Sequence, residues 1–266
     1  MKLLLCELDV LLAEDSVSAI ATLVPDAKAL LARLRRVAPL RVASASDTDA
    51  ALLGLLLPFL ALHQVGVDAL ATAGRSVPLA EGALALITAL TERGWAVRLC
   101  SSVYEPYPSA VAARLGLAEE HVIATPYPEE SLSADLGAYA LASISELGED
   151  LATLRDDDVP ALASRVERFY MSDISYSGFA EALAEDSPLA AEDWVLPAEE
   201  ALRDLGLAWR DSVVVGCSAG AGPLLDAARA GGGLALVVGS KVISRGESLG
   251  DLTALLPRLE AWQPRA

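Results

Sequence analysis

Two carboxylates near the N-terminus are spaced for proton chemistry. Glu7 and Asp9 stand two residues apart at the end of the apolar run KLLLC. Side chains two apart on a strand point to the same face, so the two would form a coupled pair with one raised pKa. Such a pair suits general acid/base catalysis. The alternative is that Glu7 makes a hydrogen bond or an ion pair inside a silent pocket.

Cys217 is a candidate nucleophile in the stretch SVVVGCSAGAGP at 212–223. Loop amides and a following helix N-terminus would lower the pKa of its thiol. However, His63 belongs to an apolar segment and His121 begins a strand, so neither is an evident base for a cysteine dyad. A packing thiol is therefore the favoured interpretation.

The rest of this loop and a second strand end supply candidate binding groups. Ser218 and Gly220 bring backbone N–H groups that can hold an anion without side chains, although a simple tight loop explains them equally well. Ser102 and Tyr104 follow another apolar run, and Tyr127 follows a third. Together with Cys217 these residues could line a ligand pocket, or pack an inserted segment against the core.

Apolar runs and helical spacing predict the elements that position these residues. The expected strands are Lys2–Leu8, Leu40–Ser44, Ala96–Ser101, His121–Ala124, Ser212–Gly216 and Leu234–Val238. The expected helices are Asp26–Arg36, Leu79–Arg93, Tyr107–Leu115, Pro197–Leu205 and Pro223–Ala230, with capping glycines at Gly94, Gly116, Gly206 and Gly231. Continuous apolar strands alternating with helices predict an α/β fold with a doubly wound, mainly parallel sheet, whose site lies beyond the carboxyl ends of the strands.

Two stretches interrupt the alternation and predict the domain organisation. Residues 13–76 are helical and apolar, and residues 126–194 are acidic and largely helical. We expect both to be helical cap insertions over the strand ends. The core would then consist of residues 1–12, 77–125 and 195–266.

Composition excludes several classes of function. The 266 residues carry 37 acidic and 20 basic side chains, a net charge of −17, which argues against nucleic acid and anionic lipid. The longest apolar run, 50–62, is too short to cross a bilayer. Three scattered cysteines, among them the strand residues Cys6 and Cys100, predict buried packing thiols and no zinc site. We expect a cytoplasmic protein that binds a small molecule or a protein partner, of undetermined oligomeric state.

Four motifs in order resemble the haloacid dehalogenase (HAD) superfamily. CELDVL after the first strand is similar to its first motif, normally DxD, and AVRLCSS is similar to the second, a strand ending in Ser or Thr. LPAEEALRDLGL and VVVGCSAGAG resemble the third and fourth, normally a lysine before Pro and a GDxxxD loop. The resemblance implies a HAD-like Rossmannoid core with cap insertions.

A closer resemblance is to archaeal HAD-like proteins of the type labelled energy-converting hydrogenase subunit R. It is carried by LLLPFLAL, LAEGALALITAL, CSSVYEPYPSAV, LGLAEEHVIATPY and GGGLALVVGSK, with SDTDAALL near Asp47 adding to it. This resemblance implies a role in a larger complex or pathway cluster, by analogy only.

The resemblance also implies that the catalytic motifs are degenerate. Glu7 stands where the nucleophilic aspartate belongs, and one extra methylene displaces the attacking oxygen. The second acid, Asp9, and the second-motif serine, Ser101, remain. Uncharged residues replace the lysine and the metal-binding acids: Leu196 or Pro197 at the third motif, and Cys217 with Gly220 or Ala221 at the fourth.

We therefore expect no cofactor and no conventional Mg²⁺ site, because Mg²⁺ requires oxygen ligands. The favoured function is a pseudoenzyme that binds a ligand or partner through the former active-site face. The alternative is a metal-independent enzyme that uses Glu7 and Asp9 as acid and base beside Ser101. A phosphatase is the third reading, and it needs Asp47, Asp49 or Asp173 to replace the lost ligands.

Overall fold

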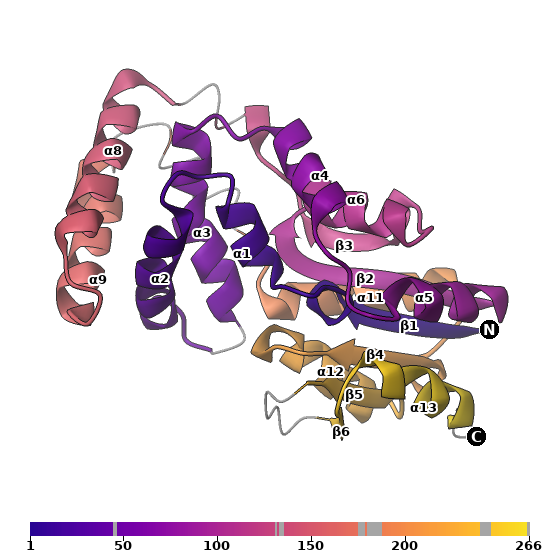
Figure 1. Ribbon diagram of the computed structural model, residues 1–266. Helices are drawn as coiled ribbons and strands as arrows, with labels where there is room; N and C mark the ends of the chain where they lie inside the picture. The colour runs from indigo at the N-terminus through magenta and orange to yellow at the C-terminus, as the bar shows by residue number, and fades with distance from the viewer. Residues whose placement is uncertain are drawn as a thin grey trace.

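The computed structural model describes residues 1–44, 47–130, 132, 136–174, 179, 188–239 and 246–264. Its centre is a six-stranded sheet of order β3-β2-β1-β4-β5-β6 in which every neighbouring pair is parallel (Figure 1). The strands are β1 Lys2–Glu7, β2 Trp95–Tyr104, β3 Val122–Thr125, β4 Ser212–Gly216, β5 Leu234–Val238 and β6 Glu247–Leu249.

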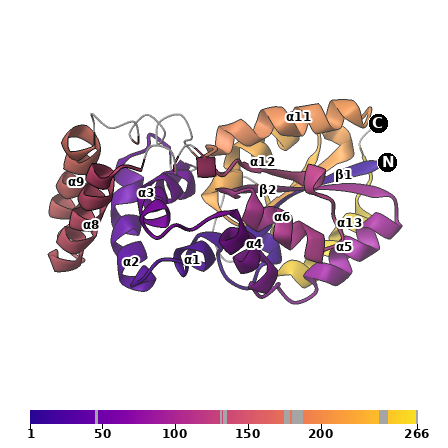
Figure 2. The same cartoon turned by 90° about the horizontal axis from the view of Figure 1, so that it is seen from above.

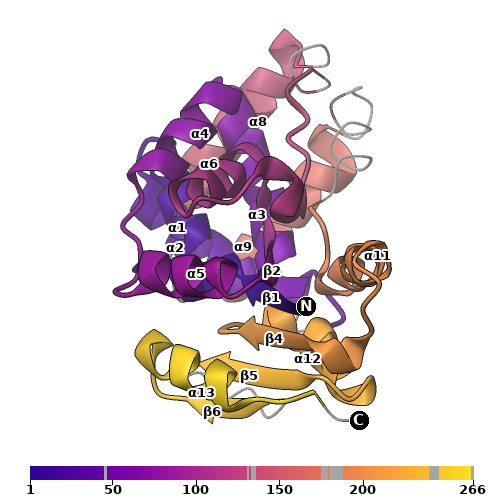
Figure 3. The same ribbon diagram turned by 90° about the vertical axis from the view of Figure 1, so that its right-hand side faces the viewer.

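Helices cover both faces of this sheet (Figures 2 and 3). On β1, Leu3 and Leu5 pack into one hydrophobic cluster with α11 Val195–Asp204 and α12 Gly222–Ala230. Leu4 and Cys6 point the other way, toward α5 Ala83–Glu92, α6 Pro106–Arg114 and α13 Leu255–Ala261. Burial on both faces explains why the central strands are continuous apolar runs without polar alternation.

A second group of helices stands beside the sheet (Figures 1 and 2). It consists of α2 Ala27–Val37, α3 Thr48–Leu62, α8 Ala138–Thr153 and α9 Val159–Arg168, while α1 Ser16–Ala21 and α4 Val67–Ser76 lie nearer the sheet. An ion pair of 2.9 Å joins Arg33 of α2 to Asp156 in the turn between α8 and α9. Helices from residues 13–76 and 126–194 therefore pack together. The boundaries of the two expected insertions, at residues 13, 76, 126 and 194, stay a prediction.

Most sequence-based expectations for the elements are confirmed. Five of the six expected strands are present with ends shifted by at most three residues, and Gly94, Gly116 and Gly206 have the expected positive φ after their helices. The strand expected at Leu40–Ser44 is wrong: a 3₁₀ turn ends at Leu40, whose side chain is 61% exposed. The C-terminal cap expected at Gly231 belongs to Gly232, where φ is 83°.

No single helix among the described residues combines the length and apolarity needed to span a membrane. The helices α3 and α4 meet those criteria only as a pair, and the chain bends by 118° between them.

Residues from early and late in the chain meet at the amino end of the sheet, where Lys2 packs against a pair of indole rings whose centroids are 6.0 Å apart. Its Nζ lies 5.0 Å from the ring centroids of both Trp95 and Trp262 and donates a 2.8 Å hydrogen bond to the Trp262 carbonyl. We predict that Lys2→Met lowers the free energy of unfolding by about 2 kcal/mol, since it removes two cation–π contacts and one hydrogen bond. Urea unfolding measures this, with the exposed Lys28→Met as the matched control; equal effects in both variants would contradict it.

Candidate functional site

The candidate site lies at the carboxyl ends of β1 and β4, where the strand order reverses. Chain order runs from β1 to β2 and β3 on one side and then returns to β4, β5 and β6 on the other. Glu7 is the last residue of β1, and Gly216 is the last residue of β4. Crevices at such a reversal are where open α/β sheets bind ligands.

Glu7 turns its carboxylate onto the loop that follows β4. One oxygen, Oε2, accepts hydrogen bonds from the backbone N–H groups of Cys217 at 2.6 Å and Ser218 at 3.0 Å. The other oxygen, Oε1, accepts a hydrogen bond from the Ser218 hydroxyl. The side chain is only 6% exposed. Both carboxylate oxygens are thus engaged by the loop.

Four amides of this loop are consequently not available to an external anion. Those of Cys217 and Ser218 donate to Glu7, the N–H of Gly220 donates to the Ser218 Oγ at 3.0 Å, and that of Ala221 donates to the Ser218 carbonyl. For these four groups the expectation of free N–H groups is wrong, because Glu7 and Ser218 accept them internally.

Asp9 does not share a strand face with Glu7. The strand β1 ends at Glu7, and residues Leu8–Leu11 form a 3₁₀ turn. The Asp9 carboxylate accepts the N–H of Ser16, the first residue of α1, at 3.1 Å. The expected strand geometry is wrong, but both carboxylates line the same small cavity and influence each other electrostatically, as expected for a coupled pair. Burial, and then the charge of Glu7, raises the pKa of Asp9 to about 7.

This shift predicts a pH dependence of stability. The unfolded pKa of an aspartate is about 3.9, so the folded state holds the Asp9 proton more tightly than the unfolded state does. The contribution is therefore complete below about pH 4 and is lost as the pH rises toward 7. We expect Asp9→Asn, which keeps an acceptor for Ser16, to gain stability over wild type by roughly 3 kcal/mol between pH 4 and 8. Urea unfolding across that range checks this; a pH-independent difference between the two proteins would refute it.

The remaining predicted residues from β2 are divided between the cavity and the core. Ser101 and Ser102 line a small cavity in front of Glu7 and Asp9, and Ser101 is 3% exposed. Tyr104 lines neither this cavity nor the hollow beside it. It is fully buried and stacks edge-on against Tyr127 with ring centroids 5.1 Å apart. This contact packs the end of β2 against the segment that follows β3.

The environment of Cys217 opposes a nucleophilic role. Burial, followed by the charges of Glu7 and Asp9, raises the pKa of its thiol far above the usual range. Burial also raises the pKa of Cys100 to about 12, and both Cys6 and Cys100 are fully buried. His121 precedes β3 at the amino ends of the strands, and His63 follows α3, so neither lines a cavity with Cys217.

The cavity in front of the two acids has a volume of about 20 Å³, room for about one water molecule. Trp194, the residue that enters α11, forms one wall and is 2% exposed. Its indole Nε1 has no hydrogen-bond partner among the described residues. Leu196 and Pro197, the residues expected in place of the third-motif lysine, do not line this cavity, and Leu196 is 59% exposed. Sequence reasoning missed Trp194, because no periodicity signals which way a residue before a helix turns.

A larger hollow of about 490 Å³ opens beside this cavity. Acidic side chains dominate its polar lining, and among the described residues Arg35 is the one basic side chain that lines it, paired with Asp15 at 2.7 Å. Its other polar lining residues are Asp9, Glu14, Asp49, Cys217 and Ser218. The hollow is thus an electronegative surface at the strand ends.

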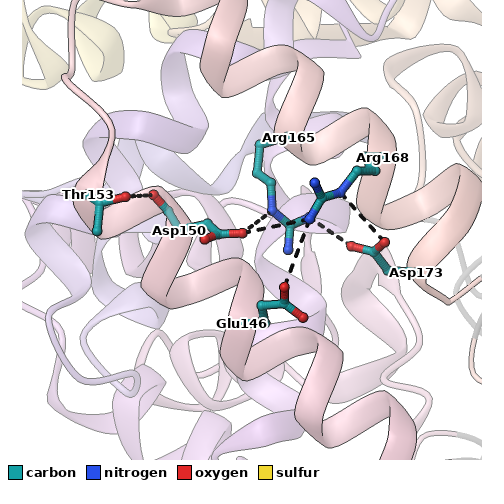
Figure 4. A network of polar contacts seen from close by, with 6 residues as sticks. All are labelled: Glu146, Asp150, Thr153, Arg165, Arg168 and Asp173. Atoms are coloured by element: carbon teal, nitrogen blue, oxygen red, sulfur yellow. Dashed lines mark hydrogen bonds and ion pairs between the residues drawn. The ribbon is translucent and has the colours of Figure 1, made fainter.

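The residues proposed as replacement metal ligands do not assemble a site. Asp49 lines both cavities, whereas Asp47 lines neither. Asp173 is held in the helical group by Arg165 at 2.9 Å and by Arg168 at 3.8 Å (Figure 4). Asp150 and Glu146 of α8 complete this ion-pair network.

The donor set at the strand ends does not fit Mg²⁺. Among the described residues, no group of three or more His, Cys, Asp and Glu side chains is arranged to hold a metal ion. Glu7 is engaged by three donors, and Cys217 offers sulfur where Mg²⁺ prefers oxygen.

Comparison with known proteins finds related folds and no related sequences. No family model matches the chain, and no curated protein matches it. Gene product AF1437 of Archaeoglobus fulgidus superposes with a TM-score of 0.63 at 17% identity, over 89% of this chain and 73% of that one.

Two structures of phosphoserine phosphatase are also similar. A phospho-aspartyl intermediate analogue gives a TM-score of 0.58 at 14% identity, over 97% of this chain and 98% of that one. A substrate-bound complex gives 0.57 at 13% identity, over 97% of both chains. The six-stranded parallel sheet with its flanking helices is therefore an α/β, Rossmann-like fold that is similar to the fold of phosphoserine phosphatase.

Proposed function

We propose that this protein is a catalytically silent member of the HAD-like fold that binds a ligand or a protein partner at its strand-end face. The observation that carries the proposal is the engagement of both Glu7 oxygens by the loop after β4. These three hydrogen bonds occupy three of the roughly four lone-pair sites of the carboxylate, so attack on phosphorus by Oε2 would require breaking two of them and Oε1 keeps one open site.

The space and the charges around Glu7 support the same conclusion. The cavity of about 20 Å³ accepts one water molecule, which is too little for a phosphoryl group. Electrostatic stabilisation dominates phosphoryl-transfer catalysis. Trp194, which carries no charge, forms the cavity wall at the entry to α11, where the family resemblance implies a lysine nearby.

The charge of the hollow indicates which ligands it suits. Asp9, Glu14 and Asp49 line it, and Arg35, the basic lining residue in the described part of the chain, is already paired with Asp15. A phosphate ester would be repelled there, whereas a cationic or donor-rich group would be attracted. A basic segment of a protein partner satisfies the same chemistry, and the resemblance to hydrogenase subunit R proteins makes a subunit role in a larger complex part of this proposal.

The test combines an activity assay with ligand-dependent stability. Purified protein is assayed with phosphoserine and p-nitrophenyl phosphate in Mg²⁺, and its thermal unfolding is followed with Mg²⁺, phosphate and a panel of amines. We expect no turnover and no shift with Mg²⁺ or phosphate; a bound amine at 100 times its dissociation constant would add about 2.7 kcal/mol. Mg²⁺-dependent turnover that disappears in Glu7→Gln would contradict the proposal.

One observation favours a second candidate, a metal-independent enzyme. Asp9 borders the hollow, and its pKa of about 7 suits a general acid or base at neutral pH. Turnover of a metabolite without added metal, with a rate that changes near pH 7 and is lost in Asp9→Asn, would establish this alternative over the binding role.

A further inference from the structure

We propose that the loop Gly216–Ala221 is an anion-binding cradle and that the Glu7 carboxylate is its built-in ligand. Removing that carboxylate would convert the cradle into a binding site for a small monocarboxylate such as formate. This inference concerns the loop alone and does not depend on whether the protein is catalytic.

The donors of the cradle converge as they do around a bound anion. The consecutive amides of Cys217 and Ser218 both point at one oxygen of Glu7, at 2.6 and 3.0 Å. Consecutive backbone N–H groups aimed at one point form the anion-binding concavity known as a nest. The Ser218 hydroxyl serves the second oxygen, so the cradle matches the two oxygens of one carboxylate.

The hydroxyl of Ser218 is oriented for this task. Its Oγ already accepts the Gly220 N–H at 3.0 Å, which directs the hydroxyl hydrogen away from the loop and toward Glu7. The Ser218 side chain is therefore pre-organised as a donor, because its acceptor role is filled from within the loop. A serine that merely capped the following turn would not need an acceptor at that position.

Gly216 lets the loop close beside the anion, because a side chain there would collide with Ala221 and crowd the Glu7 carboxylate. A Cβ at Gly216 would lie 3.3 Å from the Glu7 Oε2 and 2.3 Å from the Cβ of Ala221. Close approach of backbone to a ligand is a general use of glycine. The small residues of this loop thus shape a pocket around a carboxylate, and they do so without any basic side chain.

Burial and helix orientation favour an anion of low charge. Glu7 is 6% exposed and Ser218 is 9% exposed, so the hydrogen bonds are shielded from water. The N-terminus of α12, which begins at Gly222, contributes partial positive charge. Asp9 lies close enough to Glu7 for the charge of Glu7 to raise its pKa, which disfavours a dianion in the same space. A planar monoanion therefore fits better than phosphate.

The experiment is chemical rescue of Glu7→Ala. Urea unfolding of this variant is measured with increasing sodium formate and, at the same ionic strength, sodium chloride. We expect formate alone to stabilise Glu7→Ala, with a ratio of folded to unfolded protein that rises as one plus the formate concentration over its dissociation constant, about 100-fold at 100 times that constant. Wild type, whose cradle is occupied, should respond equally to both salts, and Glu7→Ala/Ser218→Ala should bind formate more weakly than the single variant.

Equal responses of Glu7→Ala to formate and chloride would overturn the proposal, as would a formate-specific response of wild type. If Glu7→Ala does not fold, amide hydrogen exchange of wild type decides. Cys217 and Ser218 amides that exchange as slowly as those inside β4 support a bound carboxylate, whereas exchange at the rate of an open loop excludes it. Phosphatase activity is not a readout here, so failure of this inference and failure of the proposed function give different results.

Discussion

Replacing Glu7 by leucine should lower the free energy of unfolding by about 4 kcal/mol. The leucine side chain has a similar volume, but it leaves two backbone N–H groups and the Ser218 hydroxyl without their acceptor in a buried site. Each unsatisfied buried donor costs about 1–3 kcal/mol. Urea unfolding monitored by tryptophan fluorescence measures the change.

Two further variants test whether the loss of stability comes from the hydrogen bonds of Glu7 or from the loss of any glutamate side chain. Glu7→Gln keeps one acceptor oxygen and should fall between wild type and Glu7→Leu. Glu199, exposed on α11, provides the matched control, because Glu199→Gln should change stability by less than about 0.5 kcal/mol. If Glu7→Leu were as stable as wild type, the buried carboxylate would not hold the loop, and the proposed lack of catalysis would lose its structural support.

Replacing Gly74 by alanine should destabilise the protein by about 2–3 kcal/mol. Helix propensity alone would predict the opposite sign, because alanine is favoured over glycine inside a helix. Gly74 lies within α4, where α4 crosses α6, and a Cβ there would stand 2.3 Å from the Tyr107 carbonyl oxygen and 3.0 Å from the Cβ of Ala110. The carbonyl belongs to a helix backbone, so relief requires α4 and α6 to move apart. Thermal or urea unfolding measures the loss.

Gly54→Ala is the control that isolates the steric cause. Gly54 lies inside α3, and among the described residues an added Cβ would meet the Pro188 side chain at 3.7 Å, an ordinary contact. Alanine should therefore be neutral or stabilise by up to about 1 kcal/mol through helix propensity. The same sign for both variants would show that the spacing of α4 and α6 does not depend on Gly74.

The sequence by itself determined the elements of the core. The runs KLLLC, SVVVG and LALVV predict β1, β4 and β5, because strands buried on both faces must be apolar throughout. Glycines with positive φ at Gly94 and Gly116 mark helix ends for an equally local reason, the absence of a Cβ. The strand predicted at Leu40–Ser44 is absent, because local composition does not tell whether a neighbouring strand is there to pair with it.

Only the tertiary structure decided what the site residues do. Glu7 and Ser218 are 211 positions apart, and their meeting follows from the parallel pairing of β1 with β4. The same pairing directs the amides of Cys217 and Ser218 at the Glu7 carboxylate, whereas the sequence alone predicted that they would be free to bind a ligand. Asp9 does not continue strand β1, because the chain turns immediately after Glu7. Trp194 lines the cavity because the direction of its segment is set by packing against the sheet. Side-chain identity is local, whereas the direction of a side chain and its partners depend on elements distant in sequence, and these decide whether a carboxylate is a nucleophile or a clamp.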